Sequence, residues 1–116
     1  MTLIALYLHP PQRAAFLYGR YESDPHKEGA VRAIVEAVFE PAQAGDANSV
    51  RILPDDKVKI ANEIAGVFGL QMIGWMFTHP PRKAEEPLLA PELRNMAKLQ
   101  NRFRPPSEPG SRFITV

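Results

Sequence analysis

Residues 70–81 of this chain read LQMIGWMFTHPP, an almost unbroken apolar run that ends in a histidine and two prolines. A short continuous apolar run between turn residues is typical of a strand that is buried on both faces. Gly69 before the run and Pro80 after it supply those boundaries. The stretch therefore predicts a central strand over residues 70–79, whose last residue, His79, could hold a metal ion.

The segment before this strand has the pattern of an amphipathic helix. Asp55 or Asp56 can cap its start, and Gly69 is a natural stop. Apolar residues recur between them at intervals of three and four, which places them on one face of a helix. These residues are Val58, Ala61, Ile64, Ala65 and Phe68. We expect a helix near residues 56–68 that packs this face on a sheet.

A second helix is predicted after the strand, over residues 90–103. Pro91 stands in its first turn, where proline is tolerated. One face of this helix carries Glu92, Met96, Leu99 and Phe103, and Leu93 and Ala97 widen it. The pattern again indicates a helix with one side against a core.

The remaining elements are predicted to be strands. Residues 14–22 are rich in aromatic and apolar side chains, which is typical of a strand. A polar turn follows, and apolar residues then alternate along residues 30–41, so the two segments favour a hairpin. Residues 50–53 form a short third strand after a turn-rich segment, and residues 111–116 form the last strand. The order predicts an α/β fold: a mixed sheet with two helices.

Composition narrows the classes of partner and site. The chain has 116 residues, a net charge of +1 and no cysteine. Without cysteine, disulfides and cysteine-ligated zinc sites are excluded. The chain also has no surplus of basic residues, which a partner such as nucleic acid or an anionic membrane would favour. No apolar run approaches the roughly 20 residues that a membrane helix needs. We therefore expect a soluble, intracellular protein without nucleic-acid binding or membrane insertion.

The end of the 70–79 strand resembles the G-W-Y-H-S-H-P motif of the MPN fold in the JAMM zinc metalloproteases. In such a motif two histidines two residues apart point to one face of a strand and ligate one zinc ion. Gly74, Trp75, His79 and Pro80 match the motif, but Phe77 stands where the first histidine should be. A phenyl ring has no lone pair for zinc, so half of the histidine pair is missing.

The other positions of that motif also depart from a working site. Pro87 and Ala90 stand where the motif has Ser and the Asp ligand, and shifting the Asp position by a few residues along the loop offers Glu92 as the carboxylate. Gln12 falls where the general-base Glu should be, and an amide cannot take a proton. We expect no catalytic residues, no bound metal and no cofactor, with His79 donating an ordinary hydrogen bond.

An alternative is a rearranged zinc site that uses His79, Glu92 and either His9 or His26. Those last two histidines lie in segments predicted to be solvated loops.

Aromatic side chains allow two interpretations. Phe16, Tyr18 and Tyr21 could form a binding face, but large aromatics on a strand are more often core, which we favour. Trp75 and Met72 could likewise line a groove, and here too the core is favoured for Trp75.

Two loops carry charge or proline. Arg82, Lys83, Glu85 and Glu86 predict a solvated loop with a minor chance of contacting a partner. Residues 102–109, RFRPPSEP, could be a proline-rich ligand, but a linker is favoured.

Five pieces of sequence, in order, carry a resemblance to a known family. They are FLYGRYES (16–23), AVFEPAQAGDANSVRILPDD (37–56), EIAGVFGLQMIGWMFT (63–78), LRNMAKLQNRF (93–103) and GSRFITV (110–116). Together they resemble the MPN domain of the nuclear protein localization protein 4 family, a catalytically inactive relative of the JAMM metalloproteases. The resemblance implies an MPN-like domain over residues 12–116, partial at its C-terminus, after a lead-in at residues 1–11.

What the resemblance implies for function is an adaptor rather than an enzyme. Members of that family recruit polyubiquitinated clients to the valosin-containing AAA ATPase, together with the ubiquitin fusion degradation adaptor, for unfolding and proteasomal degradation. They act in the cytoplasm and nucleus and at the endoplasmic reticulum surface, and a groove in their MPN domain engages ubiquitin chains.

Family members also carry a ubiquitin-like domain and cysteine-rich zinc fingers, which this chain lacks. The zinc fingers help to dock the ATPase, so the sequence does not predict whether this chain docks to it directly. We expect weak or absent ubiquitin binding by the chain alone, because it lacks the C-terminal part of the family's domain that would complete a binding surface. The alternative is a structural MPN-type scaffold subunit. The sequence singles out no residue that contacts ubiquitin.

Overall fold

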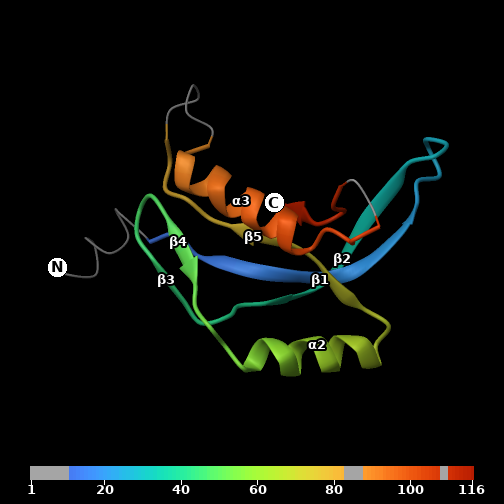
Figure 1. Ribbon diagram of the computed structural model, residues 1–116, viewed down its shortest axis with the longest axis horizontal. Helices are drawn as coiled ribbons and strands as arrows, with labels where there is room; N and C mark the ends of the chain where they lie inside the picture. Colours follow the sequence, from blue (N-terminus) through green and yellow to red (C-terminus); the bar gives the residue numbers. More distant parts are fainter. Residues whose placement is uncertain (1–10, 83–87, 108–109) are drawn as a thin grey trace.

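The computed structural model describes residues 11–82, 88–107 and 110–116. His9, Lys83, Glu85, Glu86 and Pro87, which the sequence analysis named, lie outside the described residues. In chain order the elements are β1 (Ala14–Ser23), β2 (Val31–Phe39), β3 (Gln43–Gly45), β4 (Val50–Ile52), α2 (Lys57–Val67), β5 (Gln71–Phe77), α3 (Ala90–Arg102) and β6 (Ile114–Thr115) (Figure 1). The predicted α/β arrangement of a mixed sheet with two helices is confirmed.

β5 lies inside a four-stranded sheet of order β2-β1-β5-β6. It runs antiparallel to β1 and parallel to β6, and β1 and β2 form the predicted antiparallel hairpin. The central position explains the unbroken apolar run, because the middle of β5 is covered on both faces. The predicted strand over 70–79 was too long, however: β5 ends at Phe77.

A second, two-stranded sheet was not predicted. β3 pairs with β4 in antiparallel register, from Gln43 opposite Ile52 to Gly45 opposite Val50. The short strand predicted over residues 50–53 is confirmed as β4. The segment of β3 lies in the turn-rich stretch, where no strand was predicted, because a three-residue strand shows too few alternations to be recognised.

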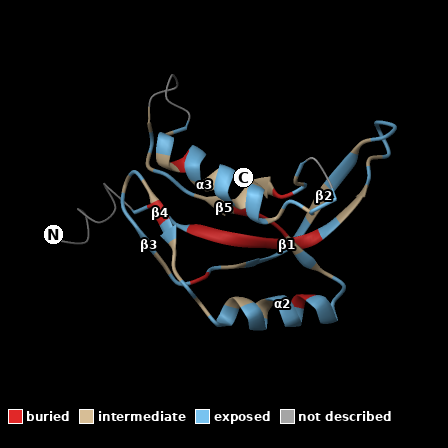
Figure 2. Cartoon of the chain, viewed as in Figure 1, coloured by how far each residue is buried: buried red, intermediate tan, exposed pale blue. Residues whose placement is uncertain are grey.

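Alternate residues of β1 supply the centre of the core. Ala14, Phe16 and Tyr18 are at most 3% exposed and pack with Trp75 of β5. Side chains from β4, from both helices and from Phe113 contact the same cluster. Figure 2 shows this concentration of buried residues along β1, between α2 and α3. The prediction that the aromatic residues are core is confirmed for Phe16, Tyr18 and Trp75.

Tyr21, further along β1, is only half-buried. Its hydroxyl donates to the carbonyl oxygen of Arg112 at 2.8 Å, and the Arg112 guanidinium lies 5.9 Å from the ring centre. Tyr21 therefore ties the β1–β2 ribbon to the segment before β6, and the core prediction was wrong for this residue.

α2 ends as its sequence indicates, because Gly69 follows the helix with a φ of 73°, which favours glycine. At its start the N-cap residue Asp56 makes no side-chain cap hydrogen bond, and Asp55 Oδ1 accepts the amide of Lys57 at 2.9 Å instead. The predicted buried face was partly wrong, because Ile64 and Phe68 are 56% and 74% exposed.

The side of α2 that packs on the core is narrower than predicted. Val58, Ala61 and Ala65 contact the core cluster. Each residue of a helix is rotated by about 100° around the helix axis from the residue before it. The residues on either side of the narrow packed face of α2 therefore point toward solvent. An apolar stripe is left exposed; it consists of Ile60, Ile64, Val67 and Phe68.

The contact of β6 with β5 depends on a glycine. A Cβ atom placed on Gly74 would lie 2.6 Å from the Ile114 carbonyl oxygen and would also meet the Ile114 side chain. Trp75 Nε1 donates to Thr115 Oγ1 at 2.8 Å in the same strand pair. The predicted last strand over 111–116 is shorter than expected, because only Ile114 and Thr115 form ladder pairs.

The region predicted as a proline-rich linker is partly ordered by packing. Phe103, directly after α3, stacks on Phe113 with ring centres 4.2 Å apart.

Within the part of the chain that the structure describes, no helix is long and apolar enough to cross a membrane.

Candidate functional site

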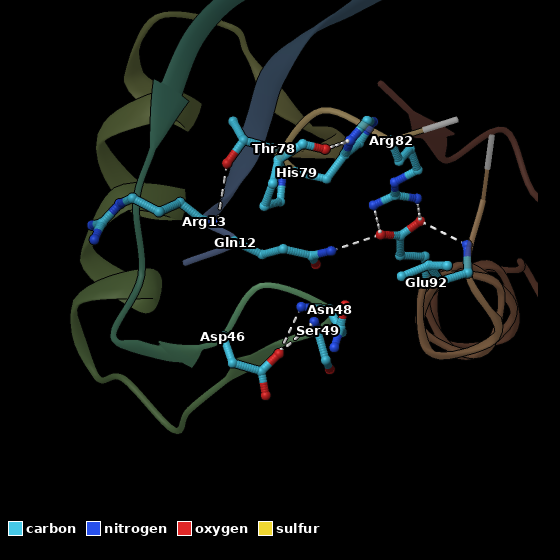
Figure 3. Close-up of polar contacts among 11 residues, drawn as sticks. Gln12, Arg13, Asp46, Asn48, Ser49, Thr78, His79, Arg82 and Glu92 are labelled. Atoms are coloured by element: carbon cyan, nitrogen blue, oxygen red, sulfur yellow. Dashed lines mark hydrogen bonds and ion pairs between the residues drawn. The ribbon is translucent and has the colours of Figure 1, made fainter. Parts of the chain in front are cut away.

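The chain leaves β5 alongside the start of β1. Thr78 donates its amide to the Arg13 carbonyl oxygen at 2.8 Å, and Thr78 Oγ1 accepts the amide of Arg13 at 3.1 Å. His79 is exposed, and its Nδ1 donates to the Pro80 carbonyl oxygen at 2.8 Å (Figure 3). The predicted hydrogen bond of His79 is confirmed, although the residue stands two positions beyond the strand rather than at its end.

A buried ion pair lies beside this segment. Arg82 donates from Nη1 to Glu92 Oε1 at 2.7 Å and from Nη2 to Glu92 Oε2 at 2.6 Å. Gln12, two residues before the start of β1, donates from Nε2 to the same Glu92 Oε2 at 2.6 Å (Figure 3). Gln12 and Glu92 are 2% and 1% exposed. We name these three residues, Gln12, Arg82 and Glu92, the Glu92 cluster.

Glu92 is placed by the start of α3. Leu89 caps the helix, and its amide donates to Glu92 Oε1 at 2.9 Å, so the side chain reaches back over its own first turn. Pro91 occupies the first turn, where a missing amide hydrogen is no loss. A carboxylate in this position also suits the positive end of the helix dipole. Local sequence therefore orients Glu92, and the fold brings Gln12 and Arg82 to it.

Electrostatics keep the Glu92 cluster ionised. The Arg82 guanidinium, through its hydrogen bonds, lowers the pKa of Glu92 to about 2, and the Leu89 amide and Gln12 act in the same direction against the opposing effect of burial. Forked arginine–carboxylate pairs of this kind are among the stronger charge-assisted hydrogen bonds. Among the described residues, Gln12 Oε1 is the one buried side-chain oxygen or nitrogen without a hydrogen-bond partner.

The donor set at this position does not fit a zinc ion. A catalytic zinc site in a protein needs three side-chain ligands and an open position for water. Phe77 has no donor atom, and both carboxylate oxygens of Glu92 already accept hydrogen bonds. Within residues 11–82, 88–107 and 110–116, no group of three or more His, Cys, Asp or Glu side chains could hold a metal ion. The alternative zinc site combined His79 and Glu92 with either His9 or His26. His9 lies outside the described residues, and His26 lies exposed in the turn between β1 and β2.

The structure thus brings together two of the residues named from the motif and separates the others. Gln12 and Glu92 are hydrogen-bonded, whereas His79 contacts the Phe77 ring at a centre distance of 6.3 Å. Ala90 is the first residue of α3. The prediction of a solvated loop was wrong for Arg82, whose side chain is only 12% exposed. Glu92 three positions after a helix cap is a recognisable sequence signal, but nothing in the sequence pairs it with Arg82.

A groove of about 890 Å³ is the other candidate site. It lies between α2 and α3, with Phe16, Met72 and Trp75 among the residues that line it from the sheet. Leu99 and Phe103 line it from the side of α3. Trp75 and Met72 therefore belong to both interpretations made from the sequence, since they pack in the core and also line the groove.

The polar part of the groove is predominantly positive. Three cationic residues line it, Arg51, Lys98 and Arg102, against one carboxylate, Asp55. The backbone amides of Ala42 and Lys57 donate hydrogen bonds to the Asp55 carboxylate and lower the pKa of this carboxyl, so its charge is already compensated within the chain. The groove can offer an apolar surface and three cationic side chains to a bound chain, although the Arg102 guanidinium also lies 5.4 Å from the centre of the Phe103 ring.

Comparison with known proteins places these features in a family. Residues 13–87 match the sequence profile of the NPL4 family. The chain belongs to the NPL4 family. It is 32% identical over 124 residues to the human nuclear protein localization protein 4 homolog. This alignment covers 90% of this chain and 20% of the human protein. The corresponding Dictyostelium discoideum protein is 33% identical over 103 residues, covering 88% and 16%. The Drosophila melanogaster protein is 39% identical over 67 residues, covering 58% and 10%.

The resemblance stated from the five sequence pieces is therefore confirmed at the level of the NPL4 family. The chain spans about a fifth of the length of its human relative. The family match covers the sheet from β1 through β5 together with α2, whereas α3 and β6 lie beyond it.

Proposed function

We propose that this chain is an MPN-type, non-catalytic part of an adaptor that handles ubiquitin chains. It would help to deliver polyubiquitinated clients to the valosin-containing AAA ATPase, together with the ubiquitin fusion degradation adaptor, in the cytoplasm and nucleus. Membership of the NPL4 family supports this proposal. So does the Glu92 cluster, because its carboxylate is neutralised by arginine where a metalloprotease would need free metal ligands.

The observation that carries the proposal is the groove between α2 and α3. Its volume of about 890 Å³ falls in the range of about 300–1,000 Å³ that ligand pockets occupy. The apolar side chains that line the groove, among them Met72, Leu99 and Phe103, are half-buried. A groove lined in this way suits an extended polypeptide, whose backbone and alternate side chains can lie along it. The excess of cations predicts that acidic residues in the bound segment are favoured.

Affinity of this chain alone is expected to be low. An extended segment loses conformational entropy when it binds, so a large contact surface is needed to offset that loss. The groove offers only part of such a surface, and we expect a dissociation constant weaker than about 10 μM. Four-fifths of the length of the human relative lies outside this chain, so a longer family protein should bind more tightly.

A binding experiment with matched charge reversals tests the groove. Lys98→Glu changes a groove cation on α3, and Lys59→Glu makes the same change on the exposed outer side of α2, outside the groove. We expect Lys98→Glu to weaken binding of polyubiquitin two- to five-fold, corresponding to about 0.5–1 kcal/mol for one exposed charge, and Lys59→Glu to have no effect. Equal effects of the two variants would exclude the groove.

Pull-downs with the two partners separate the adaptor from the scaffold. The 116-residue chain and a longer family protein are each presented with ubiquitin chains and with the AAA ATPase. If the short chain bound the ATPase tightly while neither protein bound ubiquitin, the adaptor assignment would be wrong and a structural scaffold would replace it. A metal analysis completes the set: one zinc ion per chain together with chelator-sensitive cleavage of ubiquitin chains would overturn the non-catalytic assignment.

A further inference from the structure

α3 is held to the rest of the molecule by side chains near both of its ends. Near its C-terminal end, Gln100 donates to the Phe113 carbonyl oxygen, and Phe103 stacks on Phe113. In its middle, Asn95 Nδ2 donates to the Val50 carbonyl oxygen at 2.9 Å. At its N-terminal end, the Glu92 cluster supplies the tie.

The Glu92 cluster joins three segments that are distant in the sequence. Gln12 comes just before β1, Arg82 follows β5, and Glu92 lies in the first turn of α3. The two hydrogen bonds between Arg82 and Glu92 fix direction as well as distance, because both planar groups must lie edge to edge. An apolar contact of similar size would leave the helix free to rotate or shift by a small amount.

The same helix forms one wall of the groove. Asn95, Lys98, Leu99 and Arg102 line the groove and follow Glu92 along α3 at helical spacing. Any rotation or outward tilt of the helix at Glu92 would therefore change the width of the groove and the exposure of its lining. Trp75 is among those lining residues, is only 1% exposed, and is the one tryptophan in the sequence.

We propose that the Glu92 cluster positions α3 and thereby sets the width of the groove. In this role Arg82 acts on the groove through Glu92 and the helix, without touching a ligand itself. The inference concerns the unliganded chain, so it does not depend on what the groove binds.

The test removes both charges together. In Arg82→Met/Glu92→Met no unpaired buried charge is left, so folding can be retained while the directional tie is lost. The matched control is Arg13→Met/Glu40→Met, which removes an arginine–glutamate pair of similar length, 2.8 Å, that is exposed and lies beside Gln12 in the sequence. Both proteins are compared with the unaltered chain by acrylamide quenching of Trp75 and by hydrogen exchange of the α3 amides.

The proposal expects a local change. Arg82→Met/Glu92→Met should raise the quenching constant of Trp75 at least two-fold and speed exchange in residues 94–102 at least tenfold, while β1 and β5 amides keep their protection. The exposed-pair control should match the unaltered chain in both measurements. Unchanged quenching and exchange in Arg82→Met/Glu92→Met would overturn the proposal, and so would an equal loss of protection in α3 and β1, which indicates a general contribution to stability.

A milder variant covers the case in which the double variant does not fold. Arg82→Lys keeps the charge but loses the forked pair of hydrogen bonds. We expect it to give a smaller change of the same kind, confined to α3 and Trp75, and a wild-type response would overturn the proposal. Failure of ubiquitin binding by the unaltered chain would leave these results untouched, so the two proposals can fail separately.

Discussion

Replacing Glu92 by glutamine should remove a defined part of the acid sensitivity of this fold. The pKa of Glu92 is lowered from 4.5 to about 2 in the folded chain, chiefly by the hydrogen bonds from Arg82. A carboxyl with a lowered folded pKa stabilises the folded state above pH 4.5, and that contribution is lost as the pH falls from 4.5 toward 2. The difference between the two pKa values corresponds to about 3 kcal/mol of unfolding free energy. Solvent screening takes little from this figure, because Glu92 is 1% exposed.

Most of this contribution disappears within an accessible pH range. At pH 3 an unfolded glutamate is almost fully protonated, whereas folded Glu92 is still mostly ionised, so about 2 kcal/mol is lost between pH 7 and pH 3. Urea unfolding followed by Trp75 fluorescence measures this loss in the unaltered chain and in Glu92→Gln. We expect the loss between the two pH values to be about 2 kcal/mol smaller in Glu92→Gln.

The other carboxylates whose pKa is lowered are present in both proteins and cancel in the comparison. Among the described residues they are Glu22, Glu40 and Asp55; Glu40 is exposed and the other two are partly exposed. Glu40→Gln removes a carboxylate from an exposed ion pair whose contribution is screened by solvent, so it serves as the control, and its pH dependence should differ far less from the unaltered chain than that of Glu92→Gln. The reasoning would be refuted by an identical pH dependence in Glu92→Gln, or by a carboxyl NMR titration of Glu92 with its midpoint near 4.5. The NMR titration needs no variant, so it decides the matter even if Glu92→Gln is too unstable to study.

Three further predictions concern packing. Gly74→Ala places a methyl group against Ile114, so β6 should detach, with a loss of about 1–3 kcal/mol and rapid hydrogen exchange at its amides; full protection of β6 in this variant would contradict the geometry. Thr115→Val leaves the Trp75 indole N–H without its acceptor and should cost about 1–2 kcal/mol in urea unfolding, whereas Thr115→Ser should cost little. Val67→Lys, on the exposed stripe of α2, should change the unfolding free energy by less than about 0.5 kcal/mol; a larger loss would mean that the stripe is covered in solution.

Long periodic segments were predicted well from the sequence. β5 shows an unbroken apolar run because it lies between β1 and β6, and α3 shows a proline start and a face whose Met96, Leu99 and Phe103 pack on the core. The predicted width of that face was wrong, because Leu93 and Ala97 are exposed. β3 could not be recognised, because three residues carry no measurable period and its pairing partner β4 is just as short. For α2 the period was right but the buried face was not. Ala65 faces the core and Ile64 faces solvent, and the spacing of three and four allows either assignment.

The candidate site shows the same division. The departures from the motif, Phe77 in place of a zinc ligand and Gln12 in place of the general base, could be identified from the sequence, because a phenyl ring has no lone pair for zinc and an amide cannot take a proton wherever they lie. The fate of Glu92 could not be predicted. It was placed on an apolar face, and Arg82 was placed in a solvated loop, yet the fold buries them together.

By itself, the sequence determined the family, the α/β class and the absence of a histidine pair at the end of β5, because these depend on residue identity and on local period. Only the tertiary structure decided which residues surround Glu92. Gln12 and Glu92 are 80 residues apart, and no local pattern requires them to meet. Burying a carboxylate is favourable only when a cation and hydrogen-bond donors surround it, and those partners arrive from separate segments when the sheet and α3 close together.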